Sequence, residues 1–429
     1  MKDLVLKFKR LLKTDLVKVS FFNGLGTFFK MFSGLISIKA VASIVGPAGM
    51  ALLGQLNNFT VIIQSIAGGG ITTGLTRYIS EHVHDRDKVN VYIGTALKLT
   101  LLGSCSAGFI LVLFGSQFSE LLFSSFDYTF IFRIFGFSII IYALNALLMA
   151  ILNGYKQYRI FININLLGSV VSLIFSVVLA FTLGLKGAML SVVTYQSVVF
   201  FISVIWLFHT GIISWSFIRF DFSYFAASQL FQYSLMALVS AIVIPFSQMF
   251  VRGYIVDHIS TSDAGMWEGV NRISSMYLQI IISSLSIYYL PRLAELKEDS
   301  EYTYEVRHVY SILLPFLLCT SLIIYIFRNS IISLLFTIDF QEMEKLFSFQ
   351  LIGDILKVTG WILGYIMVAK AMVKTYIITE IFNYLIFILL SILFINWIGV
   401  KGVVIAYATS HAFYLVLMMI KFRHILFVH

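Results

Sequence analysis

A membrane-length apolar segment with a polar stripe along one face is the feature that most constrains this chain. The segment runs from Trp267 to Leu296 and is long enough to cross a bilayer. Polar residues recur in it every three or four positions, namely Glu268, Arg272, Ser275, Gln279, Ser283 and Ser286. This spacing places them on one face of a helix. Because an unsatisfied polar group facing lipid costs several kcal/mol, we predict that the stripe faces another helix or a wet cavity.

The composition indicates an integral membrane protein. Of the 429 residues, 59% are hydrophobic and 12% are charged, and the mean hydropathy is +0.93. Twelve segments have the roughly 20 apolar residues that a span requires. The predicted spans are 19–43, 51–79, 91–114, 128–152, 160–182, 187–208, 229–252, 266–291, 306–327, 346–369, 375–396 and 400–421. The remaining connections are too short for a soluble catalytic module, which disfavours membrane glycosyltransferases and polymerases with large outer loops.

The basic residues are distributed unevenly between the two sides of the predicted bundle. Nineteen of the thirty Lys and Arg residues fall on the side of the N-terminus, and six lie within spans. The other side has five, which are Lys186, Arg252, Arg328, Lys345 and Lys401. The positive-inside rule therefore predicts that both termini are cytoplasmic. The net charge of +9 follows these loops, so we attribute it to membrane topology and predict no nucleic-acid partner.

Residues 1–18 lack the short apolar core and small-residue cleavage site of a signal peptide. Leucine, valine and phenylalanine residues share one helical face in this segment, and the lysines lie elsewhere. The pattern predicts a basic interfacial helix on the cytoplasmic leaflet, with a frayed basic tail as the alternative.

The chain repeats itself when it is aligned with its own sequence at an offset of 215 residues. Gly54, Gln64, Arg77 and Arg159 then match Gly269, Gln279, Arg292 and Lys374, and the segment from Gly184 to Gly187 matches the segment from Gly399 to Gly402. We predict two six-helix lobes, 19–215 and 216–429, related by a pseudo-two-fold axis along the membrane normal. Substrate is expected between the lobes.

Two further spans carry stripes like that of the eighth. The first span has Ser20, Asn23, Thr27, Lys30, Gly34 and Ser37, and the second has Gln55, Asn58, Ser65, Gly69, Thr72 and Thr76. Small and hydroxylated residues also allow ordinary helix packing in membranes, which is the alternative for the serines and glycines. That alternative is weakest for Lys30, because a lysine near the bilayer centre costs at least ~2.5–3.5 kcal/mol unless it finds a partner or reaches the interface.

Five other charged residues in the spans are candidates for ion pairs or for coupling. Arg272 follows Glu268 by four residues, which permits an intrahelical ion pair, so Arg272 is either a ligand contact or a structural partner. In the tenth span Asp354 and Lys357 are three residues apart, and they either neutralise each other or form a protonation switch. Glu380, in the eleventh span, has no obvious local partner. No catalytic constellation, metal-ligand spacing or cofactor motif is recognisable.

Three segments resemble a known family of membrane transporters. They are GPAGMALLGQ from Gly46, WEGVNRISSMYLQ through YYLPRLAEL from Trp267, and FQLIGDILKVTGWILGYIMVAKA from Phe349. The chain resembles, over nearly its whole length, the Wzx-type O-antigen and enterobacterial common antigen (lipid III) flippases of the multidrug/oligosaccharidyl-lipid/polysaccharide exporter superfamily. Those relatives have a small residue in place of Arg272 and an acid in place of Ser275, so the charge placement of that motif does not carry over.

The resemblance implies an all-α, MATE-like protein of the bacterial inner membrane. It implies that an undecaprenyl-diphosphate-linked oligosaccharide moves from the cytoplasmic to the periplasmic leaflet by alternating access, coupled to an ion gradient. Such a protein is not an enzyme and needs no cofactor, and the polymerase of the same glycan pathway is a potential partner. A cation-coupled multidrug exporter and a polymerase or ligase acting on lipid-linked glycans are the alternatives.

On this interpretation the polar stripes supply the groups that a glycosyl diphosphate needs. We expect Lys30, assisted by Arg272, to attract the diphosphate. Gln55, Asn58 and Gln279 are expected to contact sugar hydroxyls, and Asn23 belongs to the same stripe as Lys30.

The Lys30→Ala variant tests this assignment. Removal of the cation should abolish transport of the lipid-linked glycan while the protein remains in the membrane at its normal level, because an exposed or cavity-facing lysine is not needed for folding. Glycan export and immunoblotting of membranes measure the two quantities, and normal export by the variant would reject the role.

Overall fold

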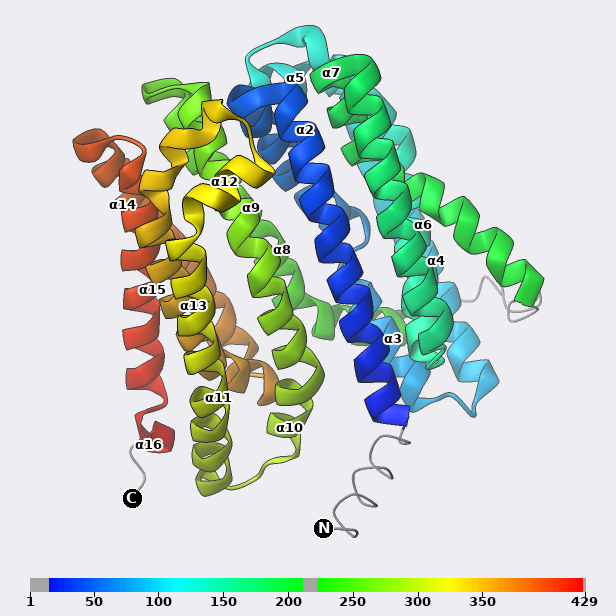
Figure 1. Cartoon of the computed structure of the whole chain (residues 1–429). Coiled ribbons are helices and arrows are strands. Elements are labelled where there is room, and N and C mark those ends of the chain that lie inside the picture. Colours follow the sequence, from blue (N-terminus) through cyan, green and yellow to red (C-terminus); the bar gives the residue numbers. More distant parts are fainter. Residues whose placement is uncertain (1–14, 211–221, 427–429) are drawn as a thin grey trace, which may run out of the picture. The chain divides into compact units, whose positions relative to one another are not determined.

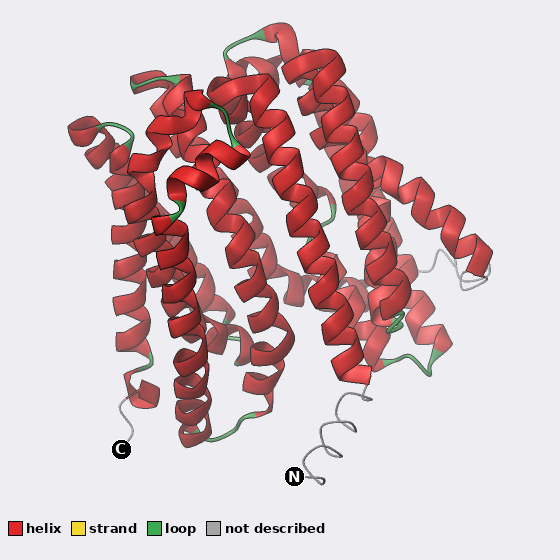
Figure 2. Cartoon of the chain, in the orientation of Figure 1, coloured by secondary structure: helices red, strands yellow, loops and turns green. Residues whose placement is uncertain are grey.

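The computed structural model describes residues 15–210 and 222–426, and every element in these ranges is helical (Figure 2). The elements, in chain order, are α2 (Asp15–Ala67), α3 (Ile71–Glu81), α4 (Arg86–Leu113), α5 (Gly115–Phe123), η1 (Phe126–Tyr128), α6 (Thr129–Gly154), α7 (Tyr158–Thr210), α8 (Tyr224–His258), α9 (Thr261–Ser284), η3 (Leu285–Tyr289), α10 (Leu290–Glu295), α11 (Asp299–Ile326), α12 (Arg328–Leu335), η4 (Ile338–Leu346), α13 (Phe347–Ala369), α14 (Val373–Ile398), α15 (Lys401–Lys421) and α16 (Arg423–Leu426).

The described helices form two compact units. The first contains the described residues of Met1–Ser37 and Ile63–Leu238, and the second contains those of Ile38–Ile62 and Val239–His429. Helix α2 therefore contributes to both. The predicted lobe boundary at 215/216 lies outside the described residues, as does most of the predicted interfacial helix at 1–18, so both stay predictions.

Each unit has a simple helical core. In the first unit α6 packs against α3, α4 and α7, and in the second α15 packs against α13 and α14 (Figure 1). Ile71, Leu75 and Ile79 of α3 recur every four residues, and they pack with Ile93 and Leu230 in the buried core of the first unit. The start of α4 is fixed by Asp85, which accepts the backbone N–H of Lys88. That hydrogen bond and the Lys88 ammonium hold the pKa of Asp85 below its usual value.

The helices account for the twelve predicted spans. Within the described residues, nine helices are long and apolar enough to cross a membrane. Two of them, α2 and α7, are each divided by a non-helical glycine, Gly46 and Gly184 respectively. Helix α9 is the predicted eighth span, and it falls outside the nine because its polar stripe lowers its hydropathy. Together the divided helices and α9 complete the all-α, multi-pass arrangement.

The backbone repeats at the predicted offset of 215 residues. Gly184 has φ 59° and ψ −136°, and Gly399 has φ 66° and ψ −150°. Lys156 and Ala371, also 215 apart, both have a left-handed φ, of 58° and 50°. In each case the residue closes a turn by donating its N–H to the carbonyl three residues earlier, at 3.0 Å and 3.1 Å. The same local structures therefore occur at matching positions of the two halves.

Hydrogen bonds between helices use the polar residues of the spans. In the first unit, Ser138 of α6 donates to the Val193 carbonyl of α7 at 2.7 Å, and Asn145 donates to Gln196 at 3.1 Å. Such bonds hold membrane helices together, since lipid offers no competing donor or acceptor. Ser138 and Asn145 of α6 thus have structural roles in holding α6 against α7.

Substitution of Gly184 or Gly399, the matching glycines of the two halves, should destabilise the protein. Gly184 and Gly399 lie near a backbone region that almost only glycine adopts, so Gly184→Ala and Gly399→Ala should each cost about 1–3 kcal/mol. Thermal unfolding of the purified protein in detergent measures the loss.

Gly253→Ala is the matched control. Gly253 lies inside α8 with an open space where a Cβ would be, so alanine there should be neutral or stabilising, by up to about 1 kcal/mol. Equal unfolding temperatures for all three variants would contradict the proposed strain.

Candidate functional site

A buried cluster of charged residues lies in the second unit, where α8 and α9 meet the part of α2 between Ile38 and Ile62. Glu268 is its centre. One carboxylate oxygen accepts from Arg252 Nη2 at 2.5 Å, and the other accepts from Arg272 Nε at 2.8 Å. Arg252 also donates to Gln55 Oε1 at 3.3 Å, and its guanidinium lies 5.4 Å from the ring centre of Trp267. We call Arg252, Glu268 and Arg272 the arginine–glutamate cluster.

The arginine–glutamate cluster carries one more positive than negative charge. Arg252 is only 1% exposed and Glu268 is 6% exposed, whereas the Arg272 side chain is 27% exposed. Gly54 makes room for the carboxylate, because a Cβ at this position would lie 2.5 Å from the Glu268 carboxyl group. The surplus charge therefore sits on a membrane helix, with Arg272 as the cation that solvent or a ligand reaches.

The structure confirms one sequence prediction for this cluster and corrects another. The ion pair between Glu268 and Arg272, predicted from their spacing of four residues, is formed. The sequence predicts Arg252 at the outer end of the span 229–252, and this boundary was wrong. Helix α8 continues to His258, so Arg252 is inside a helix and buried. A carboxylate sixteen residues away in the chain compensates its charge, which no local pattern indicates.

The other predicted substrate-binding residues are more scattered. Asn58 is buried, and its Nδ2 has no acceptor within the described residues. Gln279 is exposed and donates to Ser283 Oγ at 3.4 Å. Lys30 is exposed in the part of α2 that belongs to the first unit, and the Asn23 side chain lies outside the described part of the chain. The structure thus brings Gln55 together with the arginine–glutamate cluster.

A second buried cluster surrounds Asp354 of α13, which has no exposed surface. Its Oδ2 accepts from the Tyr277 hydroxyl of α9 at 2.5 Å, and its Oδ1 accepts from the Tyr407 hydroxyl of α15 at 2.8 Å. Gln350 donates to the same carboxylate at 3.5 Å. One acidic side chain therefore links three helices. We call Asp354, Tyr277 and Tyr407 the aspartate–tyrosine cluster.

The predicted pairing of Asp354 with Lys357 takes a different form. No ion pair within 4 Å joins the two side chains. The Lys357 ammonium instead lies over the rings of Trp361 and Tyr407, at 4.8 Å and 5.5 Å from their centres. Such cation–π contacts stabilise a desolvated ammonium group. Lys357 therefore contacts the aspartate–tyrosine cluster through the Tyr407 ring, in addition to its electrostatic interaction with Asp354.

Two further titratable groups are buried in the second unit. Glu380 of α14 is 5% exposed, and His411 of α15 is 2% exposed. Glu380 interacts with the hydroxyl of Tyr376 on its own helix, and His411 meets the Tyr407 ring edge-on at 4.6 Å between ring centres. Among the described residues, no group of three His, Cys, Asp or Glu side chains is arranged to hold a metal ion. The chemistry that these clusters offer is binding and proton transfer.

Comparison with known proteins assigns the chain to a family. A family model for polysaccharide biosynthesis proteins matches residues 16–297. The chain belongs to this family. This polysaccharide biosynthesis protein is 29% identical to the lipid III flippase of Escherichia coli K12 over 404 residues, which are 93% of this chain and 96% of that protein. It is 25% identical over 373 residues to a putative O-antigen transporter of Shigella flexneri, covering 84% and 83% of the two chains.

Solved structures identify the fold of this polysaccharide biosynthesis protein. An inward-facing multidrug resistance MATE family transporter of the MOP superfamily superposes with a TM-score of 0.75. The match covers 92% of this chain and 95% of that one, at 15% identity. The chain is therefore a multi-pass membrane protein with the twelve-helix MATE fold, as the sequence predicts.

Sequence reasoning missed the partners of the buried charges, chiefly Arg252, Tyr277 and Tyr407. One signal was available for the last of these. Tyr407, His411 and Tyr414 follow one another at steps of four and three residues, which places three polar rings on one face of α15. Tyr277 and Arg252 offered no comparable pattern, because their partners Asp354 and Glu268 lie 77 and 16 residues away along the chain.

Removing Glu268 should destabilise the protein far more than removing Arg272. Glu268→Ala leaves Arg252 buried without a carboxylate, and breaking a buried pair in this way costs about 3–5 kcal/mol. Arg272→Ala removes a partly exposed partner, for which about 0–1 kcal/mol is expected. Unfolding temperatures of the two variants give the comparison, and equal losses would show that Arg252 does not depend on Glu268.

Proposed function

We propose that this protein translocates an undecaprenyl-diphosphate-linked oligosaccharide from the cytoplasmic to the periplasmic leaflet of the bacterial inner membrane. The observation that carries the proposal is the match to a lipid III flippase along 93% of this chain. The transported unit is an O-antigen or enterobacterial common antigen repeat unit. Both termini are placed in the cytoplasm, following the distribution of basic residues. The reaction changes the leaflet of the lipid and none of its bonds, so the protein is not an enzyme.

The charges of the second unit suit a diphosphate. A diphosphate that enters a membrane protein needs cations and hydrogen-bond donors in place of water. The arginine–glutamate cluster provides a surplus positive charge, and Arg272 is its exposed member. We assign Lys30 and Arg272 to the diphosphate, and Asn23, Gln55, Asn58 and Gln279 to the sugars. The polyprenyl tail stays in the bilayer throughout.

The aspartate–tyrosine cluster suits coupling to an ion gradient. When Asp354 is ionised it accepts hydroxyl hydrogen bonds from α9 and α15. A proton or another cation on this carboxylate replaces or reorients those bonds, and so it changes how three helices are held together. Lys357 and Glu380 are the charged neighbours that influence the protonation equilibrium of Asp354. The alternative function, cation-coupled export of drugs, is favoured by the same buried acids and by the MATE fold.

Translocation in vesicles tests the proposal. The purified protein is reconstituted in proteoliposomes that carry undecaprenyl-diphosphate oligosaccharide on one leaflet, and a membrane-impermeant glycosidase reports the fraction of glycan on the other. We expect a protein-dependent rise in accessible glycan with unchanged glycan mass, because a flippase moves the lipid without altering it.

The controls separate the alternatives. Empty liposomes should show no change in sidedness, and mass spectrometry detects any polymerase or ligase activity as a change in glycan mass. Unchanged sidedness together with export of a small cationic dye would replace the flippase by a drug exporter.

A further inference from the structure

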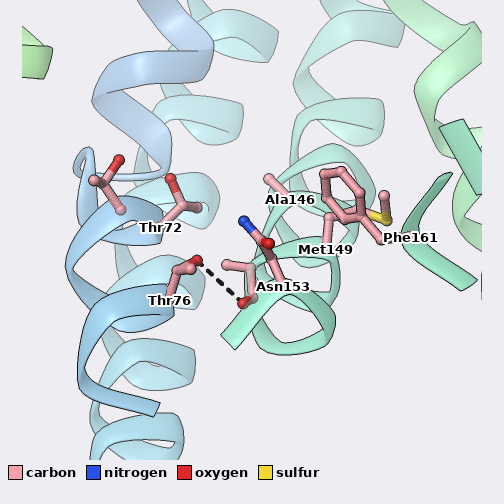
Figure 3. Close-up of a pocket in the computed structure, with 8 residues that line it drawn as sticks. Thr72, Thr76, Ala146, Met149, Asn153 and Phe161 are labelled. Atoms are coloured by element: carbon pink, nitrogen blue, oxygen red, sulfur yellow. Dashed lines mark hydrogen bonds between the residues drawn. The ribbon is translucent and has the colours of Figure 1, made fainter. Parts of the chain in front are cut away.

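The first unit contains a cavity of about 390 Å³ between α3, α6 and α7 (Figure 3). The volume falls in the range of roughly 300–1,000 Å³ that is typical of small-molecule sites. Six of the side chains that line it are Thr72, Thr76, Ala146, Met149, Asn153 and Phe161. Thr72 and Thr76 continue the polar stripe of the second predicted span, so the stripe ends in a cavity at this point.

The cavity is an open pocket whose walls combine polar groups with an aromatic ring, and none of the described residues that line it is charged. Thr76 Oγ1 donates to the Ala150 carbonyl at 3.1 Å, which leaves its lone pairs free to accept. The Asn153 amide, which points into the cavity (Figure 3), makes no hydrogen bond within the described residues. Phe161 closes one side with an apolar face. Hydroxyl and amide groups beside an aromatic face match a sugar ring, whose hydroxyls need partners and whose C–H face is apolar.

Comparison of the two halves shows that the cavity depends on small side chains. At the offset of 215 residues, Ala146 corresponds to Trp361 and Ala150 corresponds to Tyr365. The backbone next to these positions is alike, because the turns at Lys156 and Ala371 share their left-handed conformation and their hydrogen bonds. The two alanines are therefore one difference between this region and its counterpart. The backbone at the start of α3 is another, because Gly69 and Gly70 have left-handed φ angles of 57° and 63°, whereas Ser284 and Leu285 at the matching positions have φ angles of −64° and −63°.

Three exposed cations flank the cavity in the sequence. Arg77 follows Thr76, Lys156 comes three residues after Asn153, and Arg159 comes two residues before Phe161. The Lys156 N–H donates to the Asn153 carbonyl at 3.0 Å, which ties the lysine turn to the cavity wall. Arg77 also pairs with Glu81 at 3.9 Å. These cations lie on the side of the membrane that the sequence predicts to be cytoplasmic, where they favour an anionic group next to the cavity.

We propose that this cavity binds the sugar ring that is attached directly to the diphosphate of a lipid-linked glycan, with the diphosphate held by Lys156 and Arg159. It is a loading site on the cytoplasmic side, separate from the arginine–glutamate cluster. Its place in a transport cycle rests on the proposed function, whereas its affinity for a glycosyl diphosphate does not.

Binding of two probes to the purified full-length protein tests the site. The probes are farnesyl diphosphate N-acetylglucosamine and the terminal methyl ester of farnesyl diphosphate, which carry the same charge and differ by one sugar. We expect the protein to bind the sugar-bearing probe about tenfold more tightly, as two or three added hydrogen bonds allow. Ala146→Trp, which introduces the aromatic residue of the second half, should remove most of this difference, and Asn153→Ala should reduce it. Neither change should alter the binding of the methyl ester.

Two control variants define the result. Leu102→Trp adds the same ring at a position that is 70% exposed, and it should keep the full difference between the probes. The double variant Lys156→Ala and Arg159→Ala should weaken both probes by a similar factor. Equal binding of the two probes to the wild-type protein, or an undiminished difference in both Ala146→Trp and Asn153→Ala, would overturn the proposal.

The vesicle assay separates this proposal from the flippase function. If the wild-type protein moves the glycan but Ala146→Trp neither slows it nor changes probe binding, the sugar site is refuted and the function stands. If the wild-type protein moves no glycan while Ala146→Trp still abolishes the preference for the sugar-bearing probe, the site stands and the function is refuted.

Discussion

The absence of water within a bilayer is the constraint on which this structure depends. A charged side chain in a span must find its partners in the protein, because lipid offers none. Glu268 meets this requirement with two arginines, and Asp354 meets it with two tyrosine hydroxyls. The two solutions differ in their consequences. The first leaves a surplus positive charge that an anion can balance, whereas the second holds an acid with neutral donors.

The repeat explains how one fold carries both kinds of chemistry. The two halves share their turn conformations at Gly184 and Gly399, but their side chains differ at matching positions. Ser138, which donates to the Val193 carbonyl, corresponds to Gly353, where an added Cβ would lie 3.2 Å from the Cα of Ala408, the counterpart of Val193. The glycine lets α13 and α15 approach closely next to Asp354. Neutral hydrogen bonds join helices in both units, whereas the buried Arg, Asp and Glu side chains among the described residues lie in the second unit.

Those features that depend on local sequence could be predicted. The spans follow from apolar length, the repeat from matching residues, and the Glu268–Arg272 pair from a spacing of four. The partners of Asp354 lie 77 and 53 residues away along the chain, and they are determined by how α9, α13 and α15 pack. The predicted end of the span at Arg252 was wrong for a related reason. A basic residue after an apolar run indicates the end of a span unless the buried carboxylate that pairs with it, here Glu268, is known. The alanines of the cavity could not be predicted as site residues from the sequence, because their contribution is the space that their small side chains leave open.

Helix α9 connects the proposed substrate contacts with the proposed coupling site. Arg272 and Tyr277 are five residues apart on it, a separation of about 7.5 Å along a helix axis. In the proposed cycle, a diphosphate at Arg272 competes with Glu268 for that guanidinium, and a shift of α9 would act on the Tyr277 hydroxyl at Asp354. The helix is followed by a π-helical turn at Leu285–Tyr289, a geometry that often marks functional sites in helices. In the proposed cycle, the substrate and the coupling ion therefore both act on α9, at neighbouring turns. Binding of either one changes the affinity of the protein for the other.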